Sequence, residues 1–172
     1  MANKKKKSKH RQRDRRSRQK RARKARRSVP RSSRERLERR LQQKHGDDYQ
    51  VIVDPKGKAK MSEVLEDFVE PYQGQIDDTL EAQTKLISLA ALAWNATFLP
   101  EKERQKMLDD AVVTLMKGAS AKNKQEFRAI IEGMIERKMT HFAEYKRAIV
   151  DFELIDTGRG YHLTVAATMG DS

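Results

Sequence analysis

The chain has 172 residues and a formal net charge of +13, with no cysteine and only 6% aromatic residues. The absence of cysteine excludes a disulfide scaffold, thiolate zinc sites, iron–sulfur ligation and cysteine nucleophiles. The charge is unevenly distributed, because residues 1–45 carry 22 Lys and Arg against three acids, a net of +19, which leaves −6 for residues 46–172. A cationic arm on a mildly acidic body is typical of a protein that binds a polyanion.

The first part of the arm, residues 2–28, consists mainly of Lys, Arg, Ser and Gln. Dense like charges repel one another, and little apolar surface is available to offset the entropy lost on ordering. We therefore expect this segment to be disordered in isolation. A solvated tail without a partner is one alternative. An organelle transit peptide is another, disfavoured because almost no apolar face precedes Leu37.

The cations of the arm are the candidate nucleic-acid-binding residues. Lys presents a point charge to phosphates, whereas Arg presents a planar fork that binds phosphates bidentately and stacks on exposed bases. Arg is the commonest residue between positions 11 and 27, which favours structured RNA slightly over DNA. The predicted contact residues are Lys4, Lys5, Lys6, Lys7, Lys9, Arg11, Arg13, Arg15, Arg16, Arg18, Lys20, Arg21, Arg23, Lys24, Arg26 and Arg27.

A short basic helix is predicted at residues 33–45, at the end of the arm. Ser32 and Glu35 match a capping box, and Leu37 and Leu41 recur four residues apart. A helix this short, with so many like charges, is marginal on its own. We expect it to form against phosphates or against the body.

Four helices are predicted in the body. The first is capped by Ser62 and ends near Pro71, and the second spans Leu80–Phe98 behind a start signal at Asp78. Because the second helix is apolar around most of its girth, we expect it to be the central helix, with Trp94 as a core anchor.

The third helix is predicted to begin with Pro100 and to bury an apolar stripe that runs from Met107 to Met116. The fourth is predicted to be capped by Asn123 and to extend towards Phe142.

The chain ends in a predicted antiparallel hairpin. Residues 148–155 and 161–168 alternate with period two around the turn Asp156–Gly160. We expect one face to be buried under the helices and the face with His162 and Thr164 to be exposed. Tyr49–Val53 is predicted to be a further short strand.

Catalytic chemistry has few candidates in this sequence. The chain lacks the motifs of phosphate loops, nucleophile elbows and helical zinc sites. His141 and Glu144 share a helix face if the fourth helix continues past them, but two ligands do not make a metal site. We therefore predict that the protein is not an enzyme and has no cofactor and no metal. No apolar run is long enough to span a membrane as a helix, and no membrane partner is expected.

Together these features predict an α+β fold, with a disordered basic arm (1–45) followed by a mostly helical acidic domain (46–172) packed on a small antiparallel sheet. The predicted function is non-enzymatic nucleic-acid binding, RNA- or ribosome-associated, with the arm as an electrostatic anchor. The alternative is an adaptor whose helical domain binds a protein while the arm localises it to chromatin, nucleoid or nucleus. The expected location is cytoplasmic, or nuclear in a eukaryotic host.

Overall fold

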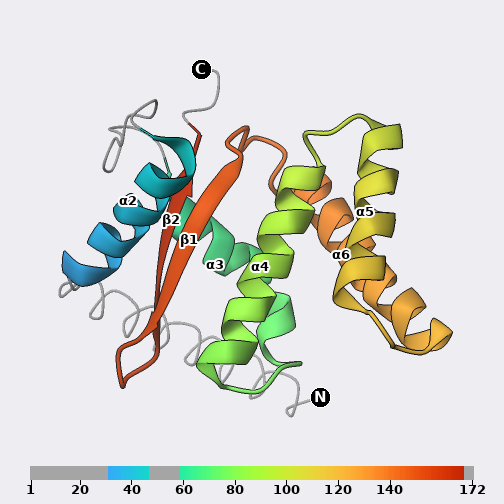
Figure 1. The fold of residues 1–172 in the computed structure, drawn as a ribbon, viewed down its shortest axis with the longest axis horizontal. Helices are drawn as coiled ribbons and strands as arrows, with labels where there is room; N and C mark the ends of the chain where they lie inside the picture. The colour runs from blue at the N-terminus through green and yellow to red at the C-terminus, as the bar shows by residue number, and fades with distance from the viewer. Residues whose placement is uncertain (1–30, 47–58, 169–172) are drawn as a thin grey trace, which may run out of the picture.

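The computed structural model describes residues 31–46 and 59–168, where five helices pack on a two-stranded antiparallel sheet (Figure 1). The α+β class predicted from the sequence is confirmed. The predicted strand Tyr49–Val53 and the arm before Arg31 lie outside the described residues. The elements in chain order are α2 (Arg31–His45), α3 (Met61–Gln73), α4 (Leu80–Ala96), α5 (Glu101–Leu115), α6 (Ala121–His141), β1 (Ile149–Asp156) and β2 (Tyr161–Ala167).

The sheet lies in the middle of three layers. Helix α2 packs on one face, while α3 and α4 pack on the other, against β2 and β1 respectively (Figure 1). Helix α6 packs on the far side of α4, and α5 packs on α6. The central position predicted for the second body helix is therefore confirmed, because α4 contacts α3, α6 and the sheet.

The terminal hairpin forms as predicted. β1 and β2 are antiparallel, and the turn is closed by a hydrogen bond of 2.9 Å from the Thr157 N–H to the Gly160 carbonyl. Gly158 and Gly160 have φ values of 69° and 134°, in a region that residues other than glycine rarely adopt. Glycine at these positions is thus explained by the turn.

The start of β1 departs from strict alternation. Period two places Val150 on the buried face with Phe152, and Ile149 on the opposite face with Asp151. The strand register shifts between Ile149 and Asp151, so Ile149 is buried and Val150 is exposed. An irregularity of this kind inserts an extra residue and reverses the facing of the residues before it, which the alternation pattern does not reveal.

The core is centred on Trp94, as predicted. Its ring is fully buried and packs edge-on against Phe68 of α3, with 5.4 Å between the ring centroids. Phe142, just after α6, packs edge-on against the same Phe68 ring at 5.5 Å. The indole N–H donates to the Arg147 carbonyl at 2.9 Å. Trp94 therefore satisfies its one polar group while joining three segments.

Asn95, the residue after Trp94, attaches α4 to the hairpin. Its side-chain amide donates to the Ile149 carbonyl at 2.7 Å, and its side-chain oxygen accepts the Ile149 N–H at 2.8 Å. This reciprocal pair substitutes for a strand partner at the irregular start of β1, and it fixes the position of the hairpin relative to the central helix.

The predicted capping residues Ser62, Asp78 and Asn123 are one to three residues away from the observed N-caps, Lys60, Thr79 and Ser120. The predicted start of the second body helix at Leu80 is confirmed. Ser62 lies inside α3, and Asn123 lies inside α6. The capping side chains are Thr79 and Ser120. The Thr79 hydroxyl accepts a hydrogen bond from the Ala82 N–H, and the Ser120 hydroxyl accepts one from the Asn123 N–H, both at 3.2 Å. At α4 and α6 several adjacent residues are able to cap, and the one that does so has an extended backbone; α3 begins after Lys60 without a side-chain cap.

Helix α5 buries less than its sequence pattern predicts. It begins at Glu101, with Pro100 just before the helix. Leu108 and Ala111 are buried, whereas Leu115 is 58% exposed. The predicted stripe is only partly buried because, in the described part of the chain, α5 packs mainly on α6.

Lys138 is a buried cation near the end of α6. Its ammonium donates to the Phe142 carbonyl at 2.7 Å and the Tyr145 carbonyl at 3.0 Å, and lies 4.5 Å from the centroid of the Trp94 ring. Burial lowers the pKa of this lysine, and the nearby charge of Lys146 lowers it further. The lysine closes the end of α6 and holds the following turn against the aromatic core.

Replacing Lys138 with Met is therefore expected to lower the free energy of unfolding by about 1–3 kcal/mol, because the two carbonyls lose a charged donor. The measurement is urea unfolding followed by circular dichroism. The control is Lys117→Met, which removes an exposed lysine after α5 and should change stability by no more than about 0.5 kcal/mol. Equal effects of the two substitutions would contradict the structural role of Lys138.

Candidate nucleic-acid interface

The predicted nucleic-acid-binding residues, from Lys4 to Arg27, all lie outside the described residues. The structure therefore does not place them relative to one another. It does describe the segment to which the arm is attached, helix α2, and the face of the hairpin on which α2 packs.

Helix α2 is formed against the body, one of the two possibilities that the sequence left open. Its inward side consists of Ser33, Leu37 and Leu41, all of them buried. Complete burial of a leucine side chain contributes about 1.5–3 kcal/mol relative to exposure. The two leucines, four residues apart, thus provide the apolar contribution that a short basic helix lacks in isolation.

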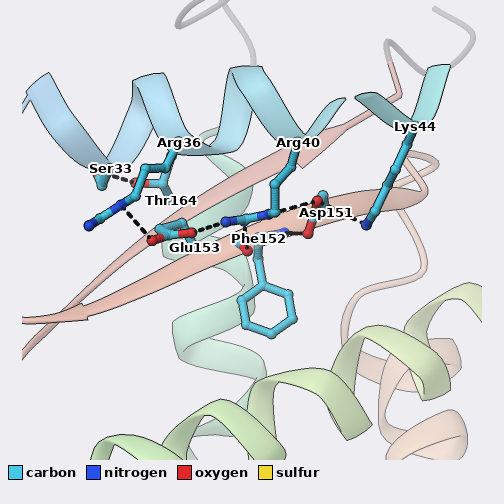
Figure 2. Close-up of polar contacts among 8 residues, drawn as sticks. All are labelled: Ser33, Arg36, Arg40, Lys44, Asp151, Phe152, Glu153 and Thr164. Atoms are coloured by element: carbon cyan, nitrogen blue, oxygen red, sulfur yellow. Dashed lines mark hydrogen bonds and ion pairs between the residues drawn. The ribbon is translucent and has the colours of Figure 1, made fainter. Parts of the chain in front are cut away.

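Arg40 makes the most contacts between α2 and β1 (Figure 2). Its guanidinium donates to Asp151 at 3.3 Å, to the Phe152 carbonyl at 2.7 Å and to the carboxylate of Glu153. Phe152 itself points to the opposite face of the strand, towards α4 (Figure 2). One arginine thus binds three consecutive residues of β1 through its planar fork of donors.

Arg36 and Lys44 lie one helical turn before and after Arg40 and extend the contact. The Arg36 guanidinium is 3.1 Å from Glu153, and the Lys44 ammonium is 3.1 Å from Asp151 (Figure 2). We call these three residues, spaced four apart on one side of the helix, the cationic row. We call Asp151 and Glu153, two apart on one face of the strand, the acidic pair.

The two partners differ in exposure. The side chains of the acidic pair are only 13% and 14% exposed, whereas those of Arg36, Arg40 and Lys44 are 53%, 36% and 55% exposed. Ion pairs with such exposed cations contribute about 0–1 kcal/mol each. The cationic row is thus accessible from solvent while its carboxylate partners lie beneath it.

The network also shifts the pKa values of Asp151 and Arg40. Burial by itself raises the pKa of Asp151, but hydrogen bonds from Lys44, the Phe152 N–H and Arg40 outweigh burial and lower it overall. Burial acts to lower the pKa of Arg40, and the hydrogen bonds to Glu153 and Asp151 raise it. Asp151 and Arg40 are therefore charged at neutral pH.

The hairpin face that carries His162 and Thr164 was predicted to be exposed, and this is wrong for the part that α2 covers. The Thr164 hydroxyl lies 3.4 Å from the Ser33 hydroxyl and 3.3 Å from a ring nitrogen of His162. Polar residues that alternate along a strand indicate a face that is not part of the apolar core. They do not indicate whether that face meets water or a charged helix, so the prediction of solvent exposure was wrong here. Acids two apart on a strand matched to cations four apart on a helix are the signal that would have found the contact.

The outward side of α2 is less basic than its sequence suggests. Arg34 forms an ion pair of 2.6 Å with Glu38 on the same helix. Arg39 is exposed and makes no ion pair with any residue that the structure describes. The positive charge of the helix is thus divided between the cationic row, which contacts the hairpin, and an outer surface that carries both signs of charge.

Other sequence candidates do not form a chemical site. Helix α6 ends at His141, so Glu144 lies in the following turn and the two do not share a helix face. Within residues 31–46 and 59–168, no group of three or more potential ligands is placed to hold a metal ion. None of the helices in these ranges is long and apolar enough to cross a membrane.

Replacing Arg40 with Gln is expected to lower the free energy of unfolding by about 1–3 kcal/mol, because two largely buried carboxylates lose a charged hydrogen-bond donor. Urea unfolding measures the change. Arg39→Gln is the matched control, since it removes the same charge from the adjacent, solvent-facing position and should change stability by no more than about 0.5 kcal/mol. If the two substitutions cost the same, Arg40 does not hold α2 on the hairpin.

The lowered pKa of Asp151 predicts a pH dependence of stability. A carboxylate whose pKa is lower in the folded state stabilises the protein above its ordinary pKa, and this contribution is lost as the pH falls through the folded value. Urea unfolding at a series of acidic pH values should therefore give a stability difference between wild type and Asp151→Asn that shrinks as the pH falls. The control is Asp110→Asn, on the exposed surface of α5, and its difference in free energy of unfolding from wild type should not change in this way with pH. A difference that stays constant with pH would contradict the network.

Comparison of the chain with models of protein families, with curated proteins and with solved structures found no significant match. Any assignment of function therefore rests on the charges, contacts and exposure of the chain itself.

Proposed function

We propose that the protein is a non-enzymatic nucleic-acid-binding protein, associated with RNA or the ribosome, whose basic arm is an electrostatic anchor. The observation that carries the proposal is the division of charge, with +19 in residues 1–45 and −6 in the rest of the chain. A dense cationic segment releases counterions from a phosphate backbone when it binds, which gives affinity without base-specific contacts.

The use of arginine in the body supports assigning this contact to the arm. Arg137 donates to the carbonyls of Asp67 and Phe68, at 3.2 and 3.0 Å. Arg147 donates to the carbonyls of Thr168 and Ala59, at 2.9 and 3.2 Å. Arg128 forms ion pairs with acids on α5 and α6. These arginines hold elements of the fold together, so their donors are already engaged.

RNA is favoured over DNA because the arm is rich in Arg, which stacks on the unpaired bases of folded RNA and can become ordered upon it. The proposed setting is cytoplasmic, on the ribosome or nucleoid, or nuclear in a eukaryotic host. The arm supplies affinity with little sequence selectivity, and the body supplies any selectivity by docking to a shaped surface.

The test is salt-titrated binding of the full chain to structured RNA, duplex DNA and single strands. If the arm engages about 6–10 phosphates, affinity should fall on the order of 10³–10⁵-fold between about 50 and 200 mM salt. The matched variant keeps the full length and changes the predicted arm cations, Lys4 to Arg27, to Gln. This is preferable to deleting residues 1–45, because that deletion also removes α2 from the hairpin.

Changing the arm cations to Gln is expected to abolish binding to nucleic acid and to leave the unfolding transition unchanged. Binding by the wild-type chain with no salt slope, or equal binding by the neutralised variant, would contradict the proposal. Equal affinity for every polyanion would leave the arm as a generic tether and remove the preference for RNA.

A second candidate, the adaptor, is favoured by the apolar side chains that α5 and α6 leave exposed. Val113 and Leu115 are 69% and 58% exposed, and Ile130 is also exposed. Large apolar side chains left in contact with water are available to a protein partner. Capture of a specific protein by the chain with the neutralised arm, lost on replacing these three residues with Ser, would favour the adaptor.

A further inference from the structure

We propose that the cationic row of α2, Arg36, Arg40 and Lys44, is a phosphate-binding surface for RNA that the acidic pair, Asp151 and Glu153, occupies in the free protein. The inference rests on the proposed function and extends it from the arm into the folded domain. The hairpin carboxylates take the place of phosphates on the row, and a phosphodiester backbone competes with them for the same three side chains.

The geometry supports exchange of partners at this surface. Each carboxylate presents oxygens to two of the three cations, much as a phosphate does: Glu153 to Arg36 and Arg40, Asp151 to Arg40 and Lys44. Two residues apart on a strand, the carboxylates are about 6–7 Å from one another. This is comparable with the separation of successive phosphates along a nucleic-acid strand. The row therefore already holds two anionic groups at a suitable spacing.

Exchange does not require α2 to leave the hairpin. The buried Leu37 and Leu41 anchor the helix, whereas the ion pairs involve cations between one-third and just over one-half exposed. Pairs this exposed contribute much less than the burial of two leucines. The long side chains of Arg and Lys can therefore turn from carboxylate to phosphate while the helix stays docked. The free energy of their contacts with the phosphates must then offset the cost of leaving two largely buried carboxylates without a charged donor.

The position of α2 in the chain supports the same partner. The helix follows directly after the last predicted arm contact, Arg27, with three residues between Arg27 and its first residue, Arg31. A strand bound along the arm is thus led to the row. The row's outer side faces solvent, from which a strand can approach.

The experiment compares the affinity of full-length chains for a homopolymeric single-stranded RNA at one salt concentration. Asp151→Asn with Glu153→Gln removes the competing carboxylates while keeping the shape of the side chains. This double variant should bind RNA roughly tenfold more tightly than the charge-matched control, Glu103→Gln with Asp110→Asn. The reason is that RNA no longer has to displace the carboxylates, so the free energy of those ion pairs is not lost on binding. Both of these acids are exposed on α5, so the control reproduces only the change in net charge.

A second step assigns the gain to the row. The three cations of the row are changed to Gln in the Asp151→Asn, Glu153→Gln chain. Because the acidic pair is already neutral in that chain, removing the cations leaves no buried carboxylate without a partner. The salt slope on single strands should become shallower by about 2, since each phosphate contact contributes roughly 0.7. Changing three exposed lysines of the α5 region to Gln gives the same net charge and should leave the slope unchanged; these are Lys102, Lys106 and Lys117.

A third measurement uses the wild-type chain and so does not depend on how any variant folds. The carboxyl carbon of Asp151, followed by NMR, should titrate at a higher pH when the RNA is bound, because Lys44 and Arg40 have turned to phosphates. If this titration does not move, and the Asp151→Asn, Glu153→Gln chain binds no more tightly than its control, the inference is wrong. Steep salt-dependent binding by the wild type would then still support the arm as anchor. Absence of that binding would contradict the proposed function itself.

Discussion

A two-stranded hairpin is not stable by itself, and this constraint organises the whole molecule. An isolated pair of strands is marginal in water and requires packing against other elements. Here each face of the pair is covered by helices, but with opposite chemistry. The face with Leu163 packs on α3 and α4 through apolar contacts, whereas the face with Asp151 and Glu153 packs on α2, which adds ion pairs to its two buried leucines. Alternation along one strand thus serves two different interfaces.

The two interfaces differ in how firmly they hold. The apolar one is reinforced by Trp94 and Asn95, which bond to the backbone just before and at the start of β1. The charged one depends on two leucines and on side chains that water can reach. Salt and competing anions act on the second interface and hardly on the first, because buried apolar contacts are not screened. The end of the molecule to which the arm is attached is therefore also its more adjustable end.

Charge is used in two ways along the chain. Arg137 and Arg147 are engaged by backbone carbonyls, and Lys138 is buried at the end of α6 above an aromatic ring. These cations stabilise the fold and are poorly suited to bind a partner. The arm has a high density of cations and few acids to pair them. This contrast is the reason for assigning the nucleic-acid contact to the arm and, at its junction with the body, to α2.

The sequence by itself determined the fold class, the central helix, the burial of Trp94 and the hairpin with its glycine turn, because local periodicity and turn chemistry specify these features. It also located the short basic helix through Leu37 and Leu41. Only the tertiary structure decided which residue caps each helix, that Ile149 and Val150 exchange faces, and that α2 covers the acids of β1. The packing of α2 on β1 depends on contacts between residues more than 100 positions apart, such as Arg40 and Asp151, which no local pattern encodes. The exchange of faces depends on the pairing with β2 and on Asn95, 54 positions away. The caps are local contacts, but several neighbouring residues could have made them, so the sequence pattern did not select one.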